Sequence, residues 1–148
     1  MKLSTRARYG TRALVDLAYN ADGEKIKLKD IALRQHLPLQ YLEQIITPFL
    51  AAGIVMSTRG RSGGITLLQK PTQIKLSHII QLLEGKMTPV ECVNHPELCP
   101  YVDYCSTHDI WCHIQKAIDD ILETTTLQDL VDVERKKIAS HGNESPDS

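Results

Sequence analysis

The alternation of apolar and polar positions predicts a mainly helical chain with one β-hairpin. Apolar residues at helical spacing predict helices over residues 4–21, 27–34, 40–52, 77–83, 106–123 and 126–139. Hydroxyl side chains stand where N-caps are expected, at Ser4, Ser77, Ser106 and Thr126. Residues 53–59 and 65–68 predict two strands joined by a glycine-rich turn at residues 60–64.

Residues 27–52 have the pattern of a helix-turn-helix, in which a short helix and a tight turn precede a second helix. The apolar residues of that second helix share one face, which leaves Gln40, Tyr41, Glu43 and Gln44 outward near its N-terminal end. Those early positions reach base edges in the major groove in this motif. Glutamine can pair with adenine, glutamate can accept from cytosine, and tyrosine can contact phosphate.

Pro48 interrupts the second helix of this motif. Proline removes one helix hydrogen bond and crowds a preceding carbonyl, at a cost of about 3 kcal/mol or more. The sequence therefore predicts a kink or an early end near Thr47.

The predicted hairpin carries Arg59, Gly60 and Arg61 at its tip. A hairpin directly after a helix-turn-helix is the wing of a winged-helix domain, and arginines at its tip suit a narrow, electronegative minor groove. A glycine-rich loop can also cradle the phosphates of a nucleotide. No Lys-Ser/Thr pair opens a following helix here and no βαβ unit surrounds the loop, which argues against that alternative.

Charge divides the chain into two halves. Residues 1–86 hold 13 Lys and Arg against 6 Asp and Glu, whereas residues 87–148 hold 4 against 12. A basic half joined to an acidic half is typical of an anion-binding module attached to a module that does not bind anions. The N-terminus lacks the apolar stretch of a signal peptide, and no apolar run approaches the length of a membrane span, about 18 residues. We expect a cytoplasmic protein with reduced thiols and no membrane partner.

The helix predicted over residues 106–123 has a wide apolar stripe, which includes Ile110, Ile114, Ile118 and Ile121. The small wing and short helices leave little surface to cover it, so we expect a second copy of the chain to cover it in a homodimer. The alternative is that the stripe packs back on its own domain.

All four cysteines lie in one stretch, at positions 92, 99, 105 and 112, with His108 among the last three. At about 100° per residue, positions 105, 108 and 112 would share one helix face. Thiolates with an imidazole suit zinc or an iron–sulfur cluster, although the short cysteine pairs of common zinc and ferredoxin sites are missing. Free buried cysteines remain an alternative. A Cys105–His108 pair could be catalytic, but no substrate-positioning residues accompany it, so no enzyme is expected.

Several segments together resemble the IscR/NsrR (Rrf-two type) family of iron–sulfur-containing winged-helix transcriptional regulators. They are KLSTRARYG at the start, LPLQYLEQI, the wing TRGRSGG, three cysteines of which the last opens CSTHDIW, and TTLQDLV near the end. The resemblance covers nearly the whole chain. It implies a homodimer that binds palindromic double-stranded promoter DNA, and a labile cluster that responds to iron–sulfur status, redox state or nitric oxide.

By this resemblance Cys92, Cys99, Cys105 and His108 would be the cluster ligands, with [2Fe–2S] preferred. The first two cysteines are separated by six residues, whereas IscR-like members usually have five, and Cys112 is an extra thiol. An all-cysteine site with a [4Fe–4S] cluster therefore stays open, as does a structural zinc site without sensing. A protein-interaction adaptor is a further alternative function, and it would show no salt-dependent binding to DNA.

The expected fold is mainly α with a small β-hairpin wing, and it divides into four parts. Residues 1–84 would be the winged helix-turn-helix domain and residues 85–105 the cluster-binding loop. Residues 106–140 would be the dimerisation helix and C-terminal helix, and residues 141–148 a disordered tail. The expected function is that of a DNA-binding transcriptional regulator that acts as a repressor.

Overall fold

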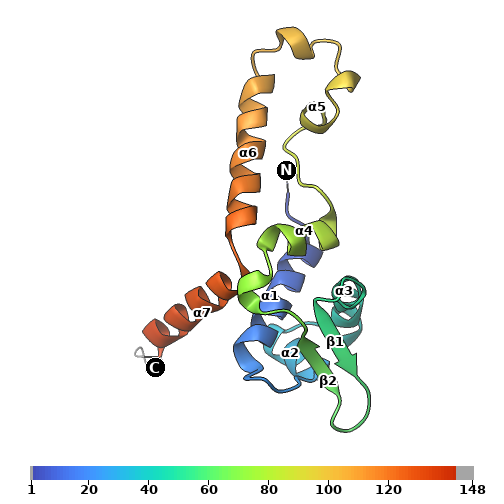
Figure 1. Ribbon diagram of the computed structural model, residues 1–148, viewed down its shortest axis with the longest axis vertical. Coiled ribbons are helices and arrows are strands. Elements are labelled where there is room, and N and C mark those ends of the chain that lie inside the picture. The colour runs from blue at the N-terminus through green and yellow to red at the C-terminus, as the bar shows by residue number, and fades with distance from the viewer. Residues whose placement is uncertain (1, 143–148) are drawn as a thin grey trace.

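The computed structural model describes residues 2–142, which form a broad base and a long arm (Figure 1). The helices and strands of the base are α1 (Thr5–Asn20), α2 (Leu28–Gln35), α3 (Leu39–Ala51), β1 (Val55–Thr58), β2 (Gly64–Leu67) and α4 (Leu76–Glu84). The arm holds α5 (Glu91–Asn94) and α6 (His108–Thr124), and α7 (Leu127–His141) returns to the side of the base. Short 3-10 turns lie at Pro71–Gln73, Pro96–Leu98 and Val102–Tyr104. The expected mainly helical fold with one hairpin is confirmed.

The core of the base lies where α1, α2, α3 and α4 meet. Its largest fully buried side chains include Leu14, Ile31, Leu42, Ile45 and Phe49. Ser4 caps α1 as expected, because its hydroxyl accepts from the Ala7 amide at 3.0 Å. These apolar residues come from one face of each helix, so burial of those faces stabilises the packing.

The wing is a two-stranded antiparallel hairpin in which Val55 pairs with Leu67 and Thr58 with Gly64. An isolated bridge between Ile26 and Ile65 ties the hairpin to the connection between α1 and α2. A Cβ at Gly64 would lie 2.7 Å from the Ile26 carbonyl oxygen, so this close approach requires glycine. The wing is therefore held against the helix-turn-helix.

The lower end of α6 is anchored to the base. The Leu76 amide donates to the Thr125 carbonyl at 2.8 Å, and the Leu127 amide donates to the Ile74 carbonyl at 2.8 Å. Thr126 caps α7 as expected and forms a capping box with Asp129. Leu127 and Val131 are buried with the core residues of the base. The lower end of the arm is therefore fixed relative to the base.

Three local expectations are wrong. The early end of α3 expected near Thr47 is wrong, because the helix continues through Pro48 to Ala51. The buried Ile46 and Phe49 flank Pro48, and their burial offsets a hydrogen bond lost near the end of the helix. Ser77 and Ser106 cap no helix, because α4 begins one residue before Ser77, with Lys75 as N-cap, and α6 begins at His108.

No helix in residues 2–142 is long and apolar enough to cross a membrane. The expected tail of residues 141–148 lies outside the described residues, except for His141, which ends α7, and Gly142.

Candidate nucleic-acid interface and metal centre

The first turns of α3 present polar side chains to solvent. Gln40, Glu43 and Gln44 are exposed, whereas the intervening Leu42 and Ile45 are fully buried. The apolar spacing along α3 fixes this orientation, because the buried positions share one face. Three of the four expected base-contacting side chains are therefore free to meet DNA.

Tyr41, the fourth, is half-buried against α1. Its ring meets Tyr9 edge-on, with the ring centroids 6.3 Å apart and the planes at 88°. The guanidinium groups of Arg8 and Arg12 lie 5.9 and 5.6 Å from the centre of the Tyr9 ring. Tyr41 thus helps to position α3, a contact that the sequence could not reveal because Tyr9 and Tyr41 are far apart along the chain.

The tip of the wing exposes Arg59, Gly60 and Arg61. Gly60 has a φ of +105°, in the region that glycine adopts without strain. A shallow cavity separates the wing from α2 and α3, and its walls include Lys27, Lys29, Leu39, Glu43 and Arg61. The sequence prediction did not include Lys27 and Lys29 among the DNA-facing residues. The only hint in the sequence is that two lysines lie two positions apart at the start of a helix.

The candidate metal ligands are spread along the arm. Cys92 lies in α5, Cys99 follows the turn Pro96–Leu98, Cys105 follows the turn Val102–Tyr104, and His108 opens α6. All four cysteines are free thiols and partly exposed. Within residues 2–142, no three His, Cys, Asp or Glu side chains lie close enough to hold a metal ion. The structure therefore does not bring the expected ligands together.

The expected shared helix face of Cys105, His108 and Cys112 is wrong, because Cys105 precedes α6. Only His108 and Cys112 lie on the helix, one turn apart, with Nε2 and Sγ separated by 3.5 Å. The Thr107 hydroxyl lies 3.2 Å from the Cys105 Sγ. It lowers the pKa of the Cys105 thiol, together with the backbone amides of Thr107 and His108.

The chemistry of these donors fits a soft metal or an iron–sulfur cluster. Their thiols are reduced and reachable from solvent, and thiolate is the form that binds metal. The His108 Nδ1 is buried without a hydrogen-bond partner among the described residues. A buried imidazole nitrogen without a partner is uncommon, and metal coordination is one way to satisfy it.

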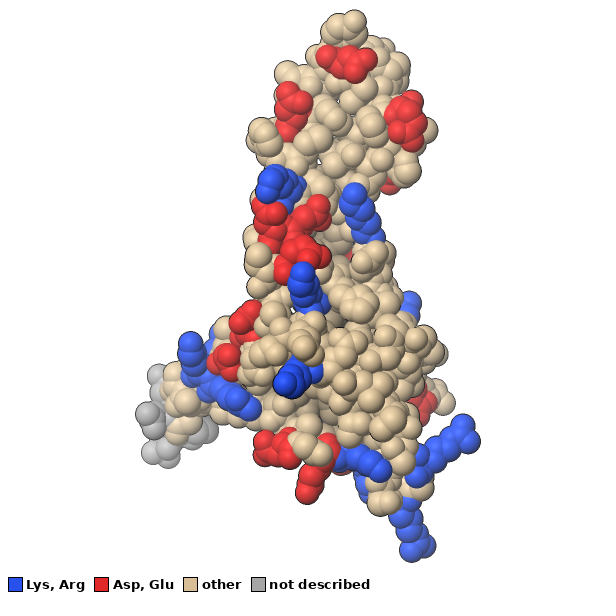
Figure 2. Space-filling view, in the orientation of Figure 1, with Lys and Arg blue, Asp and Glu red and all other residues tan. Residues whose placement is uncertain are grey.

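The upper arm carries acidic but no basic side chains, whereas the base carries both kinds. On the face shown in Figure 2, the top of the arm carries Asp and Glu, and Lys and Arg project from the lower edge of the base. Residues 87–115 contain Glu91, Glu97, Asp103 and Asp109 but no Lys or Arg. The part of the molecule that holds the cysteines would thus be repelled by nucleic-acid phosphates.

Comparison with known proteins identifies the family. The model of the Rrf2 family, described as iron-dependent transcriptional regulator, matches residues 3–133. The chain belongs to the Rrf2 family. The protein rrf2 of Nitratidesulfovibrio vulgaris is 40% identical over 131 residues, which are 88% of this chain and 87% of that protein.

Two solved structures of Rrf2-type regulators share the fold. The structure of CymR, the global cysteine regulator of Bacillus subtilis, matches with a TM-score of 0.79 and 34% identity, over 90% of this chain and 98% of that one. IscR of T. potens matches with a TM-score of 0.72 and 33% identity, over 99% and 94%. The Rrf2 protein described here is thus a winged-helix, DNA-binding transcriptional regulator and not an enzyme.

Proposed function

We propose that this Rrf2 protein represses promoters in the cytoplasm and that an iron–sulfur cluster modulates its affinity for DNA. The observation that carries the proposal is the presence, on one acidic arm, of free and partly exposed thiols and of a His108 nitrogen that is buried without a hydrogen-bond partner among the described residues. Residues 1–84 would bind DNA, residues 85–105 would hold the cluster and residues 106–140 would join two chains.

Cys92, Cys99, Cys105 and His108 would hold the cluster, which requires the loop of residues 85–105 to close on the top of α6. An iron–sulfur cluster would supply a centre that oxidants, nitric oxide or iron limitation can alter. We favour [2Fe–2S] with His108 as the fourth ligand. Cys112 lies 3.5 Å from His108 and could replace it, which would favour [4Fe–4S].

The DNA contacts would come from two elements. Gln40, Tyr41, Glu43 and Gln44 of α3 would enter the major groove, with Tyr41 directed at phosphate. Arg59, Gly60 and Arg61 of the wing would follow the adjacent minor groove.

A second copy of the chain would complete the molecule. On α6, Ile110 is 48% exposed and Ile121 is 63% exposed. The two lie on the same helix face, and exposed apolar residues along one face are typical of an interaction surface. A groove of about 830 Å³ runs between α1, α4, α6 and α7, with apolar walls that include Leu3, Val15, Leu76, Leu130 and Val133. Arg8, Arg12 and Arg34 also line it, and α6 is acidic, so the α6 of a partner fits in both hydrophobicity and charge.

Two-fold symmetry of such a dimer would present two α3 helices to two half-sites, which predicts a palindromic target. Once its cysteines bind the cluster, the loop would fix the top of α6. The lower end of α6 is bound to the base through Thr125. Loss of the cluster would free the loop and change the spacing of the two DNA-binding domains. The affinity for DNA would change with that spacing.

A structural zinc site is the second candidate. The His108–Cys112 pair one helical turn apart is a common arrangement for two zinc ligands. This alternative keeps the DNA-binding role and removes the sensing.

An anaerobic visible spectrum of freshly purified protein, with iron, sulfide and zinc analysis, tests the proposal. We expect charge-transfer bands and about two irons and two sulfides per chain, both lost in Cys99→Ser and kept in the matched variant Cys112→Ser. About four of each, lost in Cys112→Ser, would assign the fourth position to Cys112. Colourless protein with one zinc per chain would overturn cluster sensing in favour of the structural site.

A further inference from the structure

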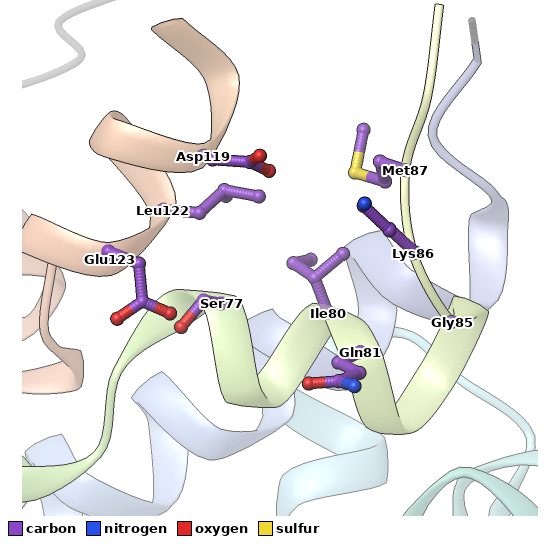
Figure 3. A pocket seen from close by; sticks show the side chains of 9 residues that line it. All are labelled: Ser77, Ile80, Gln81, Gly85, Lys86, Met87, Asp119, Leu122 and Glu123. Carbon is purple, nitrogen blue, oxygen red and sulfur yellow. The ribbon is translucent and has the colours of Figure 1, made fainter. Parts of the chain in front are cut away.

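The shallow cavity that separates the wing from α2 and α3, here called the wing cleft, differs from the apolar cavities of the base. The cavity between α4 and α6 is walled by Ile80, Met87 and Leu122 (Figure 3), and these three side chains also line the groove that would receive the α6 of a partner. The wing cleft shares no lining residue with that groove. It therefore stays accessible in the proposed dimer.

Positive charge dominates the lining of the wing cleft. Lys27 and Lys29 line it from the start of α2, and Arg61 lines it from the tip of the wing. All three residues are exposed, and none of them forms an ion pair within residues 2–142. Glu43 of α3 adds one carboxylate to the lining, so three cations face one anion. This excess of positive charge would attract a negatively charged ligand.

The two lysines are fixed relative to the wing by the segment that carries them. The Ile26 amide donates to the Ile65 carbonyl at 3.0 Å, and the Ile65 amide donates to the Ile26 carbonyl at 2.8 Å. This pair of bonds attaches the chain just before Lys27 to β2, and Lys29 follows in the first turn of α2. Lys27, Lys29 and Arg61 therefore come from elements that are already held together before any ligand binds.

The position of the wing cleft matches the path of a DNA strand. In the proposed function α3 enters the major groove and the wing follows the adjacent minor groove, and one sugar–phosphate strand separates these two grooves in B-DNA. That strand would pass between α3 and the wing, where the wing cleft lies. The argument rests on the proposed function, because it takes the two groove assignments from there.

We propose that the wing cleft binds successive phosphates of this strand and that Lys27 and Lys29 supply the cations that hold them. The phosphates would neutralise the excess positive charge of the cleft. Because phosphates are the same at every base pair, these lysines would set the register of α3 on the duplex and would select no base. Lys27 and Lys29 are thus positioning residues, and the sequence preference stays with α3.

Fluorescence anisotropy with two duplexes of equal length tests the proposal, one selected by binding from a random-sequence pool and one of mixed sequence. We expect Lys27→Met and Lys29→Met each to weaken binding to both duplexes about fivefold at about 0.1 M salt, and to reduce each salt slope by about 1. The ratio of the two affinities should change less than about twofold. Loss of a base contact would change that ratio instead.

Lys25→Met is the matched control. Lys25 is exposed and lies two residues before Lys27, but it does not line the wing cleft. Its substitution should leave both affinities within about twofold and both salt slopes unchanged. If Lys25→Met weakens binding as much as Lys27→Met, the lysines act as a diffuse positive charge and the proposed phosphate site is overturned.

Neutral phosphates in the selected duplex locate the contact. A methylphosphonate removes the charge of one phosphate, and at the strand between the two grooves it should weaken binding by the unsubstituted protein. The same methylphosphonate should have no effect on the double variant Lys27→Met/Lys29→Met, because the cations that it would have faced are gone. An equal loss at every phosphate position, or an equal loss in both proteins, would overturn the proposal. A variant that merely folded less well would show no dependence on the phosphate position.

Failure of this inference can be told from failure of the proposed function. Lysine variants that bind like the unsubstituted protein, while Gln44→Ala changes the ratio of the two affinities, would overturn the wing cleft and leave the groove assignment of α3 standing. An unsubstituted protein that binds neither duplex in a salt-dependent way would overturn the proposed function, and the inference would fail with it.

Discussion

Asp16 of α1 binds Arg34 of α2 through both carboxylate oxygens. The Arg34 Nη2 lies 2.6 Å from Oδ1, and its Nε lies 3.0 Å from Oδ2. The Asp16 side chain is 3% exposed, and Gln35 also donates to it at 2.8 Å. The hydrogen bond to Asp16 raises the pKa of Arg34 further above its ordinary value. This network sets the position of α2, and α2 leads directly into α3, the second helix of the helix-turn-helix.

Removal of the cation from this pair should destabilise the domain. Arg34→Met leaves the buried Asp16 carboxylate without its partner, and we expect the free energy of unfolding to fall by about 2 kcal/mol. The loss should be smaller than the ~3–5 kcal/mol of a fully buried pair, because the Arg34 side chain is 40% exposed.

Urea denaturation measures this change, with the exposed Lys136→Met as control. The double variant Asp16→Leu/Arg34→Met should regain part of the loss, since it removes the unpaired buried charge. An unchanged unfolding midpoint in Arg34→Met would mean that solvent replaces the arginine without cost.

The wing should contribute a phosphate-dependent part of DNA affinity. Arg59→Ala removes one exposed cation at the tip, so we expect weaker promoter binding and a salt slope reduced by about 1. Fluorescence anisotropy over a range of salt concentrations measures both quantities, with Lys136→Ala on α7 as control. If Arg59→Ala leaves affinity and slope unchanged, the wing does not contact DNA.

The exposed stripe of α6 should hold the dimer together. Ile121→Glu places a charge on a side chain that is 63% exposed in one chain and that would be buried against the partner. Sedimentation should then show monomers at concentrations where the unsubstituted protein is dimeric. Glu123→Gln, on the other side of α6, is the control. A dimer that survives Ile121→Glu would move the interface away from this stripe.

Periodicity along the chain predicted what depends on local sequence. The exposed Gln40 and Glu43, the wing arginines and the Thr126 cap follow from spacing within one element. The failures have tertiary causes. Packing of Phe49 carries α3 through Pro48. The bond from the Leu76 amide to the Thr125 carbonyl fixes the start of α4 at Leu76, so Ser77 lies inside the helix and not at its N-cap.

The site was predicted less fully than the fold. The pairing of Tyr9 with Tyr41 joins residues that no local pattern relates. Cys92, Cys99, Cys105 and His108 were predicted to converge, yet within residues 2–142 no three such side chains lie close enough to hold a metal ion. The spacing of the cysteines along the chain limits how far apart their thiols can lie. The metal–thiolate bonds that would hold the loop in place form only when a cluster is bound. Likewise, only three-dimensional burial shows that the Gln115 Oε1 has no hydrogen-bond partner among the described residues.

The most direct test of the central claim compares the promoter affinity of cluster-loaded and cluster-free protein at one salt concentration. Anaerobic anisotropy with a palindromic promoter fragment measures both forms, and Cys99→Ser supplies a cluster-free form without chemical treatment. We expect the two forms to differ in affinity by about tenfold, the size of a typical coupling between sites. Equal affinities for the loaded and cluster-free protein would contradict cluster control of DNA binding.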